Sequence, residues 1–215
     1  MRNYFLLLPF LLISYFSYSQ KEFKFDHVVE YKTIDKVHKK TYNTYWFLNS
    51  KDKDVLFTVW EGKNDYNMMV SLADGTYYYG TIVKEDFFVE AISLRCPYSG
   101  KKNVPKLTDY KYERKKDTLI NTSSYGHFVM TPLNKKEIKK HNLLPLHYLT
   151  ENKLELDFLS VKPNDLLFQM IKEGYDLPNG LITMVYSLSN TPETQMELVQ
   201  SVPIKKYIFV DTNCK

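Results

Sequence analysis

The sequence has little glycine and little arginine, and each scarcity argues against a class of site. Glycine accounts for 7 of the 215 residues, and no glycine-rich loop of the dinucleotide-binding or Walker type is present. Beyond the N-terminal segment, arginine occurs only as Arg95 and Arg114. Arginine is the residue preferred for forked contacts with phosphate. We therefore expect no nucleotide or other cofactor and no nucleic-acid partner.

No apolar run in the sequence is long enough for a permanent membrane span. The longest begins at Tyr4, is interrupted by Pro9 and ends near Phe16, short of the ~20 apolar residues that a spanning helix needs. A charged start, a short apolar core and small residues at the exit are typical of a secretion signal. Ser17 and Ser19 occupy the positions that a signal peptidase reads.

The N-terminal pattern predicts two parts of the chain. Residues 1–19 are expected to be a signal peptide, and residues 20–215 a single mostly-β domain that begins at Gln20 after cleavage. A lipid anchor would require a cysteine directly after the apolar run, and none precedes Cys96. We therefore expect an exported protein, periplasmic or extracellular.

Cysteine is also scarce, with Cys96 and Cys214 as the two in the chain. An even number of cysteines in an oxidising compartment favours a disulfide, and the long loop between them would give about 4 to 5 kcal/mol in chain-entropy models. The alternative is two buried, unpaired thiols. Their spacing lacks the paired pattern of a zinc site, so we expect no metal. The net charge of +4 is too small to indicate a polyanionic partner.

Hydrophobic alternation with a period of two recurs along the chain and predicts a mostly β protein. The predicted strands cover residues 23–31, 42–48, 55–60, 66–72, 76–79, 87–94, 110–113, 124–131, 153–158, 181–188 and 205–210. Asp74-Gly75 predicts a hairpin with a type I′ turn, which needs positive φ at both central residues. Short connections favour antiparallel neighbours.

Helical signals are few. Residues 164–174 have a capping residue in front and a glycine behind, which predicts one helix. Residues 134–140 fit a single turn capped by Asn134 with Glu137 three residues on, and residues 191–193 fit the start of another short helix.

The expected architecture is an antiparallel meander of about ten strands, which twist would curl into a curved sheet or incomplete barrel, with one or two short helices. The alternative is a two-layer β-sandwich.

The five histidines, His27, His38, His127, His141 and His147, show no recognised catalytic spacing. His27 lies on the apolar face of the first strand, which favours a hydrogen-bonded core residue. His141 and His147 are six residues apart, a spacing that fits neither helical nor strand ligand pairs. We therefore assign no catalytic, cofactor-binding or metal residue.

Aromatic residues are abundant, with 18 tyrosines and 13 phenylalanines, and they are densest at residues 42–47, 77–79 and 87–88. A β core accounts for such a composition. The alternative is a concave sheet whose aromatic lining holds a lipid, another apolar ligand or an apolar segment of a partner.

Five short segments resemble a group of secreted, functionally uncharacterised proteins of flavobacterial (Bacteroidota) type. They are residues 25–31, 48–52, 116–121, 144–146 and 177–182. That resemblance implies a cysteine in mid-chain and one at the end, at Cys96 and Cys214, and it implies no catalytic residue. In element order the chain is also weakly similar to periplasmic lipoprotein carriers, whose curved sheet half-encloses an acyl chain, although those carriers usually begin with a helix.

The sequence thus favours a non-enzymatic secreted or periplasmic binding protein, whose ligand is an apolar small molecule or whose partner is an envelope protein. Two alternatives remain. One is a hydrolase with a site assembled from distant residues, using His127 or His147 with a carboxylate at a strand end. The other is an immunity-type interaction module.

Overall fold

The computed structural model describes residues 20–35, 39–102, 106–141, 143–156, 159–161, 165–187 and 194–211. These residues form one large sheet that does not close, which confirms the predicted mostly β, curved and antiparallel architecture. Its thirteen strands in the described residues are β1 (Gln20–Asp35), β2 (Lys40–Asn49), β3 (Asp52–Glu61), β4 (Asp65–Leu72), β5 (Thr76–Val83), β6 (Ala91–Leu94), β7 (Tyr98–Lys101), β8 (Tyr110–Arg114), β9 (Thr118–Ile120), β10 (Ser123–Pro132), β11 (Leu146–Glu151), β12 (Leu181–Ser187) and β13 (Thr194–Asp211).

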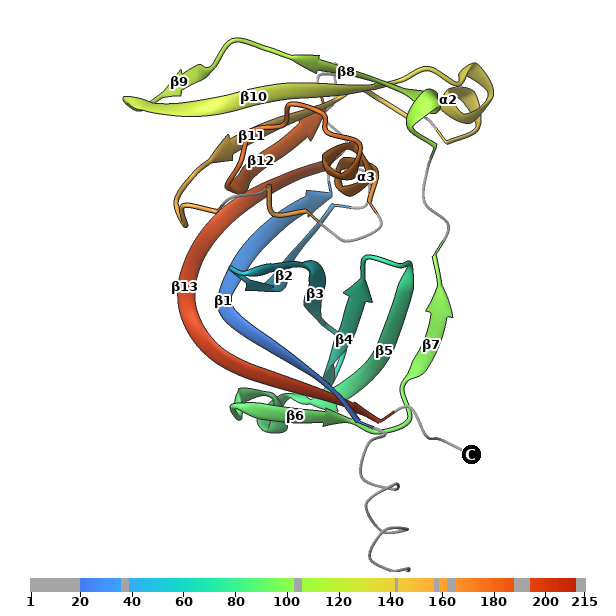
Figure 1. Ribbon diagram of the computed structural model, residues 1–215, viewed down its shortest axis with the longest axis vertical. Coiled ribbons are helices and arrows are strands. Elements are labelled where there is room, and N and C mark those ends of the chain that lie inside the picture. The colour runs from blue at the N-terminus through green and yellow to red at the C-terminus, as the bar shows by residue number, and fades with distance from the viewer. Residues whose placement is uncertain are drawn as a thin grey trace, which may run out of the picture.

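The sheet consists of two meanders joined at its centre by the first and the last strand. The strand order is β7-β5-β4-β3-β2-β1-β13-β12-β11-β10-β8, with β6 beside β13 and β9 beside β10. Strands β1 and β13 pair antiparallel along almost their whole length and curve together from the upper to the lower part of the molecule (Figure 1). The curvature leaves the two meanders facing each other at an angle.

Two irregularities accompany the bend of β13. The register between β1 and β13 shifts between Phe25 and His27 and again between Glu30 and Tyr31. Pro203 lies at the first shift, opposite His27. Proline has no N–H to give to a ladder, so it is tolerated inside a sheet at such a bulge, and bulges increase the local bend and twist.

Three apolar clusters lie against the sheet. The first is enclosed by the lower meander and includes Phe25, Phe57 and Ile208. The second packs α3 (Leu166–Lys172) against the upper meander through residues such as Phe128 and Phe168. The third lies between them and includes Val29, Tyr31, Trp46, Leu48, Leu56, Leu156 and Leu181. The sheet is therefore buried on both faces near its centre.

Strand β3 shows this double burial most clearly. Val55, Phe57 and Val59 belong to the first cluster, whereas Leu56, between them, belongs to the third. Successive side chains of a strand point to opposite faces, so a strand covered on both sides is a continuous apolar run rather than an alternating one.

The predicted helix over residues 164–174 is confirmed as α3, and its residues Leu166, Leu167, Phe168 and Met170 are buried. Asp165 accepts a hydrogen bond at its Oδ1 from the Leu166 N–H at 2.6 Å. The predicted turn after Asn134 is α2 (Lys135–His141), where the Asn134 side chain accepts from the N–H groups of Lys136 and Glu137. Residues 191–193, the other helix prediction, lie outside the described residues.

The hairpin at Asp74-Gly75 is confirmed, but its turn is not type I′. Gly75 has φ +94°, whereas Asp74 is not among the residues with positive φ. Three residues connect β4 and β5, and the Asp74 carboxylate accepts from both the N–H and the hydroxyl of Thr76. A three-residue loop of this kind needs the left-handed conformation at its last position alone.

Two predicted strands differ in the structure. Residues 87–94 divide into η1, a 3-10 helix (Lys84–Phe88), and β6, which pairs with β13 in parallel rather than with an antiparallel neighbour. The buried Lys206 ammonium donates to the carbonyl oxygens of Phe87 and Val89 and lies 4.5 Å from the Phe87 ring centre. Because those carbonyls are bound by a side chain, this segment leaves the sheet ladder.

The predicted strand at residues 153–158 is wrong over its described part, residues 153–156. Glu155 has φ +50°, which is incompatible with an extended strand. Leu156 nevertheless belongs to the third cluster and Leu154 packs against it, so a loop with one buried and one partly buried leucine produced the strand-like alternation. Strand β11, which lies just before it, was missed together with β7 and β9.

Candidate functional site

A cavity of about 920 Å³ lies between the two meanders. Its wall is mostly apolar and aromatic, and its residues come from seven strands, from α3 and from the segment before that helix. The lining residues are Thr33, Tyr42, Thr44, Trp46, Thr58, Trp60, Glu61, Met69, Leu146, Tyr148, Val161, Asp165, Leu167, Ile182, Val185 and Met196. A concave apolar lining, the alternative to a plain β core, therefore exists.

The first wall is built by cross-strand pairs of the lower meander. Trp46 of β2 lies opposite Thr58 of β3, and Thr44 lies opposite Trp60. Thr58 also lies opposite Met69 of β4. Side chains that are opposite in register share a face, so these five residues form one continuous patch.

The second wall comes from the upper meander and from α3. Leu146 and Tyr148 are two residues apart on β11 and therefore share a face, and Val185 of β12 lies opposite Tyr148. The Tyr148 ring stacks on Phe128 with ring centres 4.7 Å apart. Leu167 of α3 adds an aliphatic side chain to this wall.

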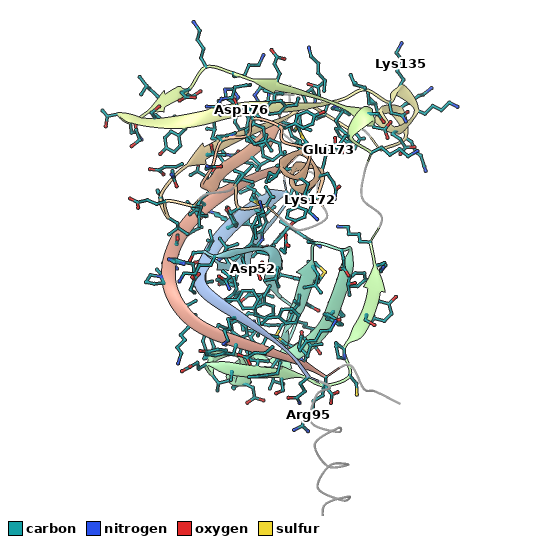
Figure 2. The ribbon with its side chains drawn as sticks, viewed as in Figure 1. Asp52, Arg95, Lys135, Lys172, Glu173 and Asp176 are labelled. Atoms are coloured by element: carbon teal, nitrogen blue, oxygen red, sulfur yellow. The ribbon has the colours of Figure 1, made fainter. Side chains whose placement is uncertain are left out.

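The cavity has a buried end and an open end. Trp46, Leu167 and Ile182 are buried, and Thr58 is only 2% exposed. By contrast, Tyr42 is 48% exposed and the side chain of Glu61 is 53% exposed. Figure 2 shows Lys172 and Glu173, at the C-terminal end of α3, in the region between the upper and lower strands.

Two polar groups inside the cavity have unusual surroundings. The buried Thr58 Oγ1 has no hydrogen-bond partner among the described residues. Burial raises the pKa of the Tyr148 hydroxyl, and the Asp165 carboxylate raises it further. Tyr148 therefore keeps its proton well above neutral pH and remains a potential hydrogen-bond donor.

The structure brings together two histidines that the sequence analysis considered as catalytic candidates. His127 Nε2 and His147 Nδ1 are 3.1 Å apart, and the His147 ring stacks on Tyr186 at 5.0 Å. Burial lowers the pKa of both rings; Lys115 lowers both further, as does Arg114 for His127 and His127 for His147. The pair is therefore neutral at physiological pH, with one ring donating and the other accepting.

The histidine pair lies on the opposite side of the sheet from the cavity. His147 alternates along β11 with Leu146 and Tyr148, which line the cavity. The strand thus separates both rings from any molecule held in the cavity. Within the described residues, no group of three His, Cys, Asp or Glu side chains is placed to hold a metal ion.

The other site predictions have different outcomes. His27 is half-buried on β1 and forms a hydrogen bond with Asp26 at 2.9 Å, which confirms a hydrogen-bonded residue there. His38 and the side chain of His141 lie outside the described residues. Cys96 follows β6 with φ +49°, whereas Cys214 lies outside the described residues, so their disulfide stays a prediction.

The aromatic segments divide between core and cavity. Tyr78 and Phe87 lie in the first apolar cluster, as expected for a β core. In the segment of residues 42–47, Tyr42 and Trp46 line the cavity, while Phe47 belongs to that cluster. The three lining threonines were missed. The one sequence signal that could have indicated them is a threonine on an otherwise apolar strand face.

No protein-family model and no curated protein match the sequence. Solved structures that match this chain include the following three. The first is the MucA/MucB complex of Pseudomonas aeruginosa (TM-score 0.41, 6% identity), where the match covers 83% of this chain and 51% of that one. The chain thus spans about half the length of that protein.

The second is a domain assigned as an outer membrane lipoprotein-sorting protein, from Vibrio parahaemolyticus (TM-score 0.30, 8% identity, 90% of this chain and 87% of that one). The third is a LolA superfamily protein from Nitrosomonas europaea (TM-score 0.30, 10% identity), where the match covers 83% of this chain and 84% of that one. The sequence matches no named family. In the described residues, no helix has the length and apolar character needed to span a bilayer.

Proposed function

We propose that this chain is an exported binding protein that holds an apolar ligand in the cavity between its two meanders. The observation that carries the proposal is the cavity itself, about 920 Å³ and lined mainly by aromatic and aliphatic side chains. This volume lies within the range of about 300–1,000 Å³ that is typical of small-molecule sites. The predicted signal at residues 1–19 supports a place in the periplasm or outside the cell.

The unpartnered Thr58 hydroxyl is a second reason to expect a ligand. Leaving a buried hydroxyl without a hydrogen bond costs about 1–3 kcal/mol. Thr58 Oγ1 is buried in the cavity wall between the apolar side chains of Trp46 and Met69. The oxygen has almost no exposed surface, so a bound molecule with a polar atom along its length would satisfy it after a rotation of the Thr58 side chain.

The two tryptophans of the chain provide a direct test, because Trp46 and Trp60 both line the cavity. We expect the neutral apolar dye N-phenyl-1-naphthylamine to bind and to quench tryptophan fluorescence by energy transfer. Val185→Glu places a carboxylate in the cavity wall and should weaken dye binding by about tenfold or more, since burying an unpaired charge is costly.

The matched control is Val202→Glu, the same substitution at an exposed position of β13 that does not line the cavity. This variant should bind the dye like the unmodified protein. If both variants bind equally well, or if the dye does not bind the unmodified protein, the cavity is not the binding site.

A further inference from the structure

The charged residues in the cavity wall all have one sign. Glu61 and Asp165 are the charged side chains in its wall, and within the described residues no lysine, arginine or histidine lines it. Both carboxylates are exposed, whereas Trp46, Thr58, Leu167 and Ile182 are buried. The cavity therefore runs from an apolar interior to an acidic opening.

Lys84 and Lys172 do not line the cavity, and each contacts another side chain. Lys84 Nζ lies 3.5 Å from Glu61 Oε1 and 5.4 Å from the ring centre of Tyr66. Lys172, at the end of α3, has its Nζ 4.9 Å from the centre of the Phe168 ring. Figure 2 labels this lysine beside Glu173. Lys84 offsets part of the Glu61 charge, whereas neither of these two lysines forms an ion pair with Asp165 within the described residues.

The aromatic residues at the opening also suit a cation. Tyr42 is half exposed, and Trp60 follows Thr58 on the same face of β3 next to Glu61. The faces of tryptophan and tyrosine rings attract ammonium groups, and the attraction grows as water is removed. A carboxylate in the same place would meet two like charges and the negative faces of these rings.

We propose that the ligand of this cavity is a cationic amphiphile, with an apolar tail in the buried end and an ammonium or amine head group between Glu61 and Asp165. The proposal rests on the function proposed above and specifies the ligand class. It excludes free fatty acids as preferred ligands. The chain has a net charge of +4, which repels cations, so a preference for a cationic ligand must come from the residues of the site itself.

The test compares three probes that share one tail, namely dodecylamine, dodecanol and dodecanoate, at neutral pH, with the two ionic probes below their micelle concentrations and the alcohol below its solubility limit. Fluorescence of Trp46 and Trp60 reports occupancy of the cavity. We expect the amine to bind about fivefold more tightly than the alcohol, as one partly exposed ion pair allows, and the carboxylate to bind most weakly. The preference should shrink as salt is added.

A double variant, Glu61→Gln with Asp165→Asn, should bring the affinities for amine and alcohol together. Asparagine keeps the helix cap that Asp165 provides. Glu113→Gln is the matched control, because Glu113 is ion-paired with Lys115 and lies outside the cavity. This variant should keep the preference for the amine.

The outcomes separate the two proposals. Equal binding of the three probes, or tighter binding of dodecanoate, overturns the cationic ligand and leaves the apolar binding function intact. Binding of none of the three overturns the binding function. The comparison of probes on the unmodified protein requires no variant, so it holds even if the double variant fails to fold.

Discussion

Gly180 is a residue at which the backbone itself decides the structure. It has φ +102°, and a Cβ there would lie 2.5 Å from the carbonyl oxygen of Glu151 and 2.7 Å from Cα of Asn152. Its carbonyl accepts from the Ser160 N–H at 2.9 Å, which attaches the segment carrying Val161 to the start of β12. The lack of a side chain thus holds part of the cavity wall in place.

Gly180→Ala should lower the free energy of unfolding by about 3 kcal/mol or more, since it combines a strained φ with a clash against backbone atoms. Gly174→Ala is the control, because Gly174 also has positive φ, +78°, but open space around it. Gly174→Ala should lower the free energy of unfolding by about 1 kcal/mol, because the left-handed backbone conformation is its only cost. Urea unfolding of both variants measures the difference, and equal losses would show that the close approach at Gly180 has no energetic weight.

The histidine pair makes a second residue-scale prediction, in the pH dependence of stability. Burial lowers the folded-state pKa of His127 and of His147 below the ordinary value of 6.5. The unfolded chain therefore binds more protons around that pH, so stability is complete above pH 6.5 and is lost as the pH falls toward the folded-state values. Protonation of both rings would also place two N–H groups against each other.

His147→Phe keeps the ring stacking on Tyr186 and removes one of the two titrating groups. We expect a shallower fall in the free energy of unfolding below pH 6.5 than in the unmodified protein. His127→Phe should reduce the slope in the same way. Unfolding at a series of pH values tests both, and slopes identical to that of the unmodified protein would contradict the lowered pKa values.

At the scale of elements, α3 is short and depends on its ends and its packing. A helix of two turns gains little from its own hydrogen bonds, so burial of Leu166, Leu167, Phe168 and Met170 in the second cluster supplies most of its stability. Asp165 caps its first turn and also lines the cavity. One residue therefore connects the stability of the helix with the charge of the site.

Asp165→Ala should lower the free energy of unfolding by about 1 kcal/mol because the cap is lost, while Asp165→Asn should change it by a few tenths. Asp176→Ala, an exposed carboxylate beyond α3 (Figure 2), removes a charge without touching the cap. It should leave stability almost unchanged. If Asp165→Asn destabilises as much as Asp165→Ala, the negative charge rather than the cap holds the helix.

The elements also show where sequence patterns succeed. Strands β1 to β5 of the lower meander were predicted from their apolar residues, and in β4 the alternation matches the burial pattern of the strand most closely. Strand β6 was misjudged because its partner is β13, more than a hundred residues further along the chain, and because Lys206 draws the preceding residues out of the ladder. Neither fact is visible within a window of neighbouring residues.

At the scale of the whole molecule, β13 is the element on which both halves depend. It pairs with β1 along its length, with β12 at its beginning and with β6 near its end. The first and last described strands are thus adjacent at the centre of the sheet. A predicted disulfide between Cys96, two residues after β6, and Cys214 would add a covalent link between this part of the sheet and the C-terminal segment.

Mass spectrometry of the protein purified from its own cell envelope tests the predicted processing. The denatured, unreduced chain should have the mass of residues 20–215 less two hydrogens, and reduction should restore them. A mass that includes residues 1–19 would contradict cleavage before Gln20, and a mass unchanged by reduction would contradict the disulfide between Cys96 and Cys214.

Local sequence determined the class of the protein, because hydrophobic alternation, turn residues and helix caps act between near neighbours. These features predicted a curved antiparallel sheet, the hairpin at Asp74-Gly75 and the helix α3. The cavity was decided only by tertiary structure. Its walls bring together Thr58 and Trp60 from one meander with Tyr148 and Val185 from the other, residues that meet only because β1 and β13 pair and bend together.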